Sequence, residues 1–231
     1  MAGAVSANST IPSVQIGRER DKKIIELISE HGPFTRDQVQ QLVFPAHKWP
    51  QKCSQRLNKL AKAGKIKRLR FEDVGQFVYY AGKWTHKSEH QLMVNDVYVS
   101  LITQKKSWFK LQALQREYRC QWDSGELWAD ALVVLINTAK DTLKPVFAEV
   151  DRATNPFNKV EIYTQYYLSR AWCGSWWAKK DTEGAYTFPR VLVVTDRPER
   201  VRRAIEKDNA EGLRFTVATV EQIKKDIYAY L

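Results

Sequence analysis

The sequence is poor in cysteine and lacks the long apolar runs that cross membranes. Its three cysteines, Cys53, Cys120 and Cys173, are odd in number and scattered, which argues against a zinc site or a disulfide framework. No apolar run approaches the roughly 20 residues that span a bilayer. Residues 1–17 lack the basic start and apolar stretch of a secretory signal. We therefore expect a cytoplasmic protein with a flexible tail over residues 1–17 and no membrane partner.

Acidic residues are missing from one long stretch. Between Lys48 and Arg70 the chain has nine lysines and arginines and no aspartate or glutamate, in a protein of net charge +11. A solvated helix face usually mixes both signs, so a polyanionic partner explains this segment better than a merely solubilising patch, which is the alternative. Double-stranded DNA is the expected partner.

The N-terminal third has the pattern of three helices and a hairpin. Apolar spacing predicts a helix over residues 18–31, a second helix capped by Thr35, and a third after Pro50. Two runs rich in β-branched and aromatic residues flank a turn at Gly75, which is a hairpin signal. This order describes a winged-helix DNA-binding domain over residues 18–83.

The third predicted helix has a polar, basic face opposite its apolar one. In a winged helix this element enters the major groove, while the hairpin meets phosphates. A protein-binding winged helix would instead expose acids or apolar residues there. The residues expected to contact DNA are Lys52, Gln55, Arg56, Lys59 and Lys62 on the helix and Lys67, Arg68 and Arg70 on the hairpin.

Residues 84–231 read as a second, α/β domain, so that the protein is α+β overall. A helix that carries His90 and Val94 on its apolar face precedes three strand-like runs. A helix over residues 158–172, a strand buried on both faces, a helix from Pro198, a short strand and a last helix follow. We expect a mixed sheet. A lone histidine such as His90 is more often a packing residue than a ligand.

Two strands of this domain carry carboxylates. Asp130 interrupts an apolar run, where an unpaired buried carboxylate would cost several kcal/mol. Glu149 and Asp151 project from the same side of the next strand. If these strands are neighbours, Asp130 and Glu149 form the oxygen pair that Mg²⁺ requires. Lys159, at the start of the following helix, is placed to steady an attacking water or the transition-state charge.

Several short motifs resemble a known family. HQLMVNDV, LWADALVVL, FAEVDRAT and the spacing Lys159-x-x-x-Tyr163-x-x-Tyr166, after a winged helix, resemble the replication-relaxation family of plasmids and integrative mobile elements. The match runs from about residue 18 onward. The resemblance implies a PD-(D/E)XK nuclease-like second domain and a role in the replication or relaxation of a bacterial mobile element. Replication or transfer proteins are the implied partners, and paired half-sites favour a homodimer.

The resemblance also implies a catalytic site and exposes departures from it. In that fold Asp130 and Glu149 would hold Mg²⁺ or Mn²⁺, and Asp151 and Lys159 would complete a DNA-nicking site. The residue two after Glu149 is normally lysine, and here it is Asp151; Ala129 replaces a proline. Two alternatives stay open: Lys159 replaces the missing lysine in an active endonuclease, or an inactive fold serves as a non-catalytic DNA-binding regulator.

Other features also have competing interpretations. Asp151 either joins the site, pairs with Arg152 or Lys159, or helps to cap the helix after Asn155. Tryptophans in AWCGSWWAKK would either stack on the bases of an opened strand or cover the edge of a core. They are Trp172, Trp176 and Trp177.

Overall fold

The computed structural model describes residues 13–44, 50–72, 75–152, 156–179 and 184–231. Lys48 and Asn155, both named above, lie outside them. The chain divides into two compact units, Met1–Ser88 and Glu89–Leu231, which we describe separately. Within the described segments no helix is both long and apolar enough to cross a membrane.

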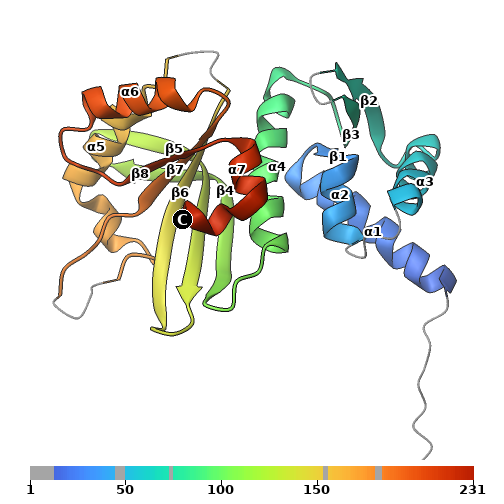
Figure 1. The fold of residues 1–231 in the computed structure, drawn as a ribbon, viewed down its shortest axis with the longest axis horizontal. Helices are drawn as coiled ribbons and strands as arrows, with labels where there is room; N and C mark the ends of the chain where they lie inside the picture. Colours follow the sequence, from blue (N-terminus) through green and yellow to red (C-terminus); the bar gives the residue numbers. More distant parts are fainter. Residues whose placement is uncertain (1–12, 45–49, 73–74, 153–155, 180–183) are drawn as a thin grey trace, which may run out of the picture. The chain divides into compact units, whose positions relative to one another are not determined.

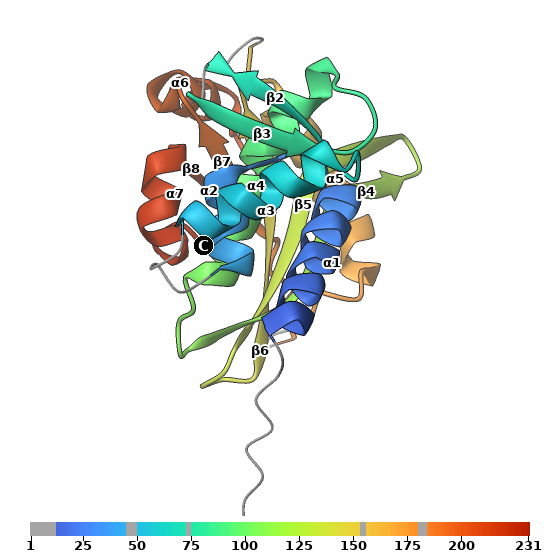
Figure 2. The same cartoon turned by 90° about the vertical axis from the view of Figure 1, so that its right-hand side faces the viewer.

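The first unit is a winged helix. Its elements are α1 (Ser13–His31), β1 (Phe34–Thr35), α2 (Arg36–Val43), α3 (Pro50–Lys62), β2 (Lys67–Phe71) and β3 (Gln76–Tyr80). The strands form one antiparallel sheet in the order β1-β3-β2, and Figure 2 shows the β2–β3 hairpin with the three helices of this unit. Helix α1 begins five residues before the predicted start. Strand β1 was not predicted, because two residues are too few to show a strand pattern.

Local chemistry explains two boundaries of this unit. Thr35 caps α2 as predicted: its Oγ1 accepts the Gln38 N–H at 3.2 Å, and Gln38 Oε1 accepts the Thr35 N–H at 2.9 Å. The hairpin turns at Gly75, whose φ of 65° suits glycine and whose N–H donates to the Glu72 carbonyl at 2.9 Å. The cap therefore sets the start of α2, and the turn sets where the hairpin reverses direction.

The second unit has the predicted α/β fold with a mixed sheet. Helix α4 (His86–Thr103), which begins just before the unit boundary, precedes β4 (Phe109–Trp122), β5 (Gly125–Asn137) and β6 (Thr142–Asp151). Then come α5 (Lys159–Ser169), β7 (Arg190–Thr195), α6 (Pro198–Asp208), β8 (Phe215–Ala218) and α7 (Val220–Asp226). The sheet order is β4-β5-β6-β7-β8, antiparallel up to β6 and parallel from β6 to β8.

Helices cover both faces of this sheet. Helices α5 and α6 pack on one face with residues such as Phe147 and Val191, and α4 and α7 pack on the other with Val146 and Leu192 (Figure 1). The α5/α6 face and the α4/α7 face are therefore two separate apolar cores.

Two helices end earlier than their apolar patterns predict. The helix expected over residues 158–172 stops at Ser169, because Arg170 takes a left-handed conformation with φ 58°. A 3-10 turn, Ala171–Gly174, follows it. The last helix, expected over residues 220–230, ends at Asp226 and continues as the 3-10 turn Ile227–Ala229.

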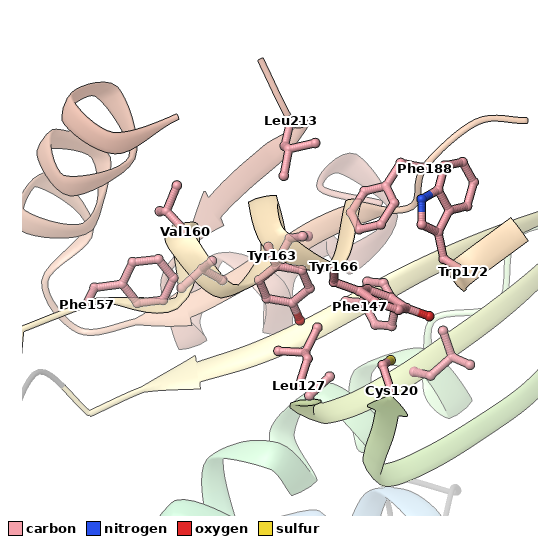
Figure 3. Packing of buried hydrophobic residues seen from close by; sticks show 14 of the residues in the cluster. Cys120, Leu127, Phe147, Phe157, Val160, Tyr163, Tyr166, Trp172, Phe188 and Leu213 are labelled. Atoms are coloured by element: carbon pink, nitrogen blue, oxygen red, sulfur yellow. The ribbon is translucent and has the colours of Figure 1, made fainter. Parts of the chain in front are cut away.

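The tryptophan cluster is mainly core. Trp172 and Trp177 have no exposed surface, and Figure 3 shows Trp172 beside Phe188 and near Phe147. The Trp172 and Phe188 ring centroids lie 5.2 Å apart. Trp176 is half-exposed. Trp172 and Trp177 therefore cover the core, as the second interpretation of the sequence held.

Candidate functional site

The carboxylate site begins at an irregularity in the sheet. Ala129 packs into the core on the α5/α6 face, whereas Ala131, two residues later, packs on the α4/α7 face. A regular strand would place both on the same face. On β4, Glu117 has a φ of 47° at the same level, between the paired positions Tyr118↔Ala129 and Arg116↔Ala131. In both strands, the alternation of side chains between the two faces of the sheet therefore shifts by one residue at this point. Asp130 is the residue of β5 at the shift.

The Asp130 side chain accepts a backbone N–H of β6 just beyond the end of the β5–β6 ladder. The regular β5–β6 ladder begins at Ala131↔Ala148, so Asp130 and Glu149 occupy the first positions beyond it. There, Asp130 Oδ2 accepts the N–H of Val150 at 2.7 Å. Its other oxygen lies 2.9 Å from Nε2 of His90 on α4. His90 therefore contacts the site, where the sequence favoured a packing role alone.

Glu149 is a buried carboxylate. Its residue is 2% exposed, on the α5 face of β6. Tyr163 Oη donates to Oε1 at 2.7 Å, and Lys159 Nζ lies 3.4 Å from Oε1 and 3.2 Å from Oε2. Burial, and then the charge of Asp130, raise the pKa of Glu149 from 4.5 to about 7, although Lys159 and the Tyr163 hydrogen bond oppose the rise. Glu149 therefore titrates near neutral pH.

One helix supplies both partners of Glu149. Lys159 and Tyr163 are four residues apart on α5, so their side chains leave the same face of the helix. Lys159 Nζ also donates to the Trp128 carbonyl at 2.7 Å, which links α5 to β5 as well as to β6. The structure thus brings together Asp130, Glu149 and Lys159, three of the four residues that the sequence nominated. The spacing Lys159-x-x-x-Tyr163 was a usable signal that Tyr163 would join them.

Asp151, at the end of β6, contacts the neighbouring strand β7. Its Oδ2 accepts a hydrogen bond from Thr195 Oγ1 on the neighbouring strand β7 at 3.0 Å. Arg152, which the sequence offered as its ion-pair partner, contacts Glu89 of α4. The sequence gave no signal for either Thr195 or Glu89, because both partners are distant in the chain.

The donor chemistry of the pair suits a hard cation. Mg²⁺ takes oxygen ligands, often one or two carboxylates completed by waters and substrate phosphates, and Asp130 and Glu149 offer two carboxylates. Among the described residues, no three His, Cys, Asp or Glu side chains are grouped as a ligand set. An ion here would therefore rest on two protein carboxylates, with the Lys159 ammonium beside one of them.

The residues nominated for DNA contact fall into two groups. Lys52, Gln55, Lys59 and Lys62 of α3 are exposed, as is Arg70 of β2. Others have defined protein contacts: Arg68 contacts Asn58 and lies over the Phe77 ring, and Lys67 donates to the Gly82 carbonyl at 2.6 Å. Both side chains remain exposed.

Arg56 contacts α1. Its Nε donates to Asp21 Oδ1 at 2.8 Å, and its guanidinium also donates to the Gly17 carbonyl at 2.8 Å. This pair joins α3 to α1. The helical spacing that placed Arg56 on the polar face could not show this partner on α1.

Comparisons with known proteins do not identify a family for this chain. No family model matches the chain, and no curated protein matches it. Among solved structures, protein VC1899 from Vibrio cholerae is 12% identical with a TM-score of 0.35, over 94% of this chain and 55% of that one. The restriction endonuclease FokI is 11% identical with a TM-score of 0.30, over 94% and 45%. The chain spans about half the length of each, and neither likeness bears on what it does.

Proposed function

We propose that the protein binds double-stranded DNA through α3 and β2 of the first unit. The supporting observation is the composition of this surface: exposed Lys52, Lys59 and Lys62 lie on one helix, Arg70 lies on the hairpin, and no acidic residue occurs over residues 50–71. Salt-dependent contact with phosphates is the chemistry that such a surface offers. With the family resemblance, this favours a DNA-binding protein acting in the replication or relaxation of a mobile element.

The exposed residues divide into base-reading and phosphate-contacting candidates. Lys52, Gln55 and Lys59 lie on the exposed face of α3, which a winged helix places in the major groove. Arg68 and Lys67 are braced by their protein contacts, so less side-chain entropy is lost when they meet phosphates. The hairpin is therefore suited to positioning and α3 to sequence recognition.

The test compares two double variants of the full chain. Lys52→Gln/Lys59→Gln removes two charges from the proposed surface, and Lys22→Gln/Lys23→Gln removes two from α1. Fluorescence anisotropy with a labelled duplex across a salt series gives the slope of log affinity against log salt. We expect the first variant to lose about two units of slope and the second less than one. Equal slopes, or a wild-type protein that does not bind duplex DNA, would refute the proposal.

Metal-dependent DNA nicking is the second candidate function. It is favoured by the meeting of Asp130 and Glu149, which would hold Mg²⁺ or Mn²⁺, with Lys159 beside them. Such an ion supplies Lewis-acid polarisation of a phosphate oxygen and a more acidic water. Lys159 would stabilise negative charge near Glu149, and Asp151, oriented by Thr195, lies at the end of the same strand. The competing view is a fold that binds DNA without catalysis.

Supercoiled plasmid separates these two views. The wild type, Asp130→Ala, Glu149→Ala and the exposed control Glu161→Ala are incubated with plasmid and Mg²⁺ or Mn²⁺. Nicking by the wild type and the control, lost in the other two variants, is the result expected of a nuclease. Binding without nicking by the wild type would leave a DNA-binding platform as the role of the second unit.

A further inference from the structure

Three cations lie at the starts of three neighbouring parallel strands. Lys144 is in β6, Arg190 is the first residue of β7, and Arg214 immediately precedes β8. We call them the strand-start cluster. Arg190 is paired with Val146 of β6. On its other side Arg214 is adjacent, since the N–H of Val191 donates to the Arg214 carbonyl at 2.8 Å. Arg190 and Arg214 therefore lie side by side on neighbouring strands, and Lys144 lies two residues nearer the start of β6 than the residue paired with Arg190.

The three side chains share one face of the sheet. Val146, Leu192 and Ala218 belong to the core on the α4/α7 face. Lys144 and Arg190 each lie two residues before one of these, and Arg214 lies four before Ala218, so the two-residue period of a strand places all three on this face. Lys144 Nζ lies 5.0 Å from the centroid of the Phe109 ring. The Lys144 ammonium group is thus close to the face of this aromatic ring.

Among the described residues, none of the three cluster cations forms a salt bridge. In the described part of the chain, the lysines and arginines of the second unit that form salt bridges are Lys106, Arg119, Arg152, Lys159, Arg202, Lys207 and Lys224. Burial, and then the charges of Arg190 and Arg214, lower the pKa of Lys144. Like charges on adjacent strands are destabilising. A bound polyanion would relieve this repulsion.

We propose that the strand-start cluster contacts the phosphate backbone of duplex DNA, as a second contact in addition to the α3 surface. This inference rests on the proposed DNA binding. Two strand spacings of about 4.8 Å and an offset of about 7 Å along β6 place the ends of the cluster about 12 Å apart, which is comparable to the rise of three to four phosphates along one DNA strand. The cluster is separate from the carboxylate site, because Lys144 precedes Glu149 by five residues, or about 17 Å along β6.

The test again uses matched variants of the full chain. Lys144→Gln/Arg190→Gln/Arg214→Gln removes the cluster, and the control Lys179→Gln/Arg203→Gln/Lys207→Gln removes three charges elsewhere in the second unit. The cluster variant is expected to lose about two to three units of salt-dependence slope for duplex binding, and the control less than one. If the triple variant does not fold, Arg214→Gln alone, at an exposed position, should lose about one unit.

Two further outcomes distinguish the ways in which this inference fails. Equal slopes for both triple variants, with a wild type that binds DNA, would overturn the second contact and leave the proposed function intact. A wild type that does not bind DNA would overturn both. In that case, a rise in Tm with inorganic tripolyphosphate, present in the wild type and lost in the cluster variant, would show a small-anion site only.

Discussion

Replacing Glu149 with glutamine should change how stability depends on pH. Folding raises the pKa of Glu149 from 4.5 to about 7, so the folded chain holds this proton more tightly than the unfolded chain. The stabilisation by the protonated form is complete below pH 4.5 and is lost as the pH rises through about 7. Glutamine, similar in size and neutral at every pH, removes this dependence.

The pKa difference sets the expected magnitude. A rise from 4.5 to about 7, at about 1.4 kcal/mol for each pKa unit, corresponds to about 3 kcal/mol. The side chain is 3% exposed, so solvent screening reduces this value little. The unfolding free energy of Glu149→Gln minus that of the wild type should therefore increase by about 3 kcal/mol between pH 4.5 and pH 8. The interaction of Lys159 with the charged carboxylate already contributes to this pKa, so it adds no separate pH-dependent change.

Tryptophan fluorescence during urea unfolding is a suitable assay. Six of the eight tryptophans lie in the second unit, and Trp172 and Trp177 are fully buried there. The control is Glu161→Gln, at an exposed position on α5. Its unfolding free energy should depend on pH in the same way as that of the wild type. If the unfolding free energy of Glu149→Gln also changes with pH in the same way as that of the wild type from pH 5 to pH 8, the explanation by burial and neighbouring charge is wrong.

Three other substitutions test particular contacts. Tyr163→Phe removes a donor to Glu149, so it should cost about 1.5–3 kcal/mol at pH 8, where the carboxylate is charged, and less at pH 5, by the same urea assay. Arg56→Ala leaves Asp21 without its partner and should lower unfolding free energy by about 1–3 kcal/mol, while the salt-dependence slope for duplex DNA stays unchanged. Trp172→Ala opens a cavity in the α5/α6 core and should cost about 3–5 kcal/mol in urea unfolding.

Most of the architecture was predictable because its signals are local. The Thr35 cap, the hairpin around Gly75 and the helix from Pro198 each depend on residues within one turn. The Arg56 pair was not predictable, because its partner lies 35 residues earlier, on another helix. The early end of α5 was also missed, since Arg170 is not a residue type that favours a left-handed conformation.

The candidate site was predictable in its members more than in its arrangement. Asp130 and Glu149 stood out as acids within apolar strands, and Lys159 stood out by its place after them. Their partners, His90 on α4 and the Val150 amide, depend on where the β5–β6 ladder stops. A pattern of alternating residues does not show that stopping point.

The reversed alternation beside Asp130 has an evolutionary consequence. Strands β4 and β5 each carry one residue more than an uninterrupted pleat requires, at Glu117 and Asp130. Deleting both residues would bring Ala129 and Ala131 into simple alternation and yield a more regular hairpin without its carboxylate. The paired insertion and the acidic site would then be gained or lost together. Relatives that lack Asp130 through deletion, rather than substitution, should also lack the residue at position 117.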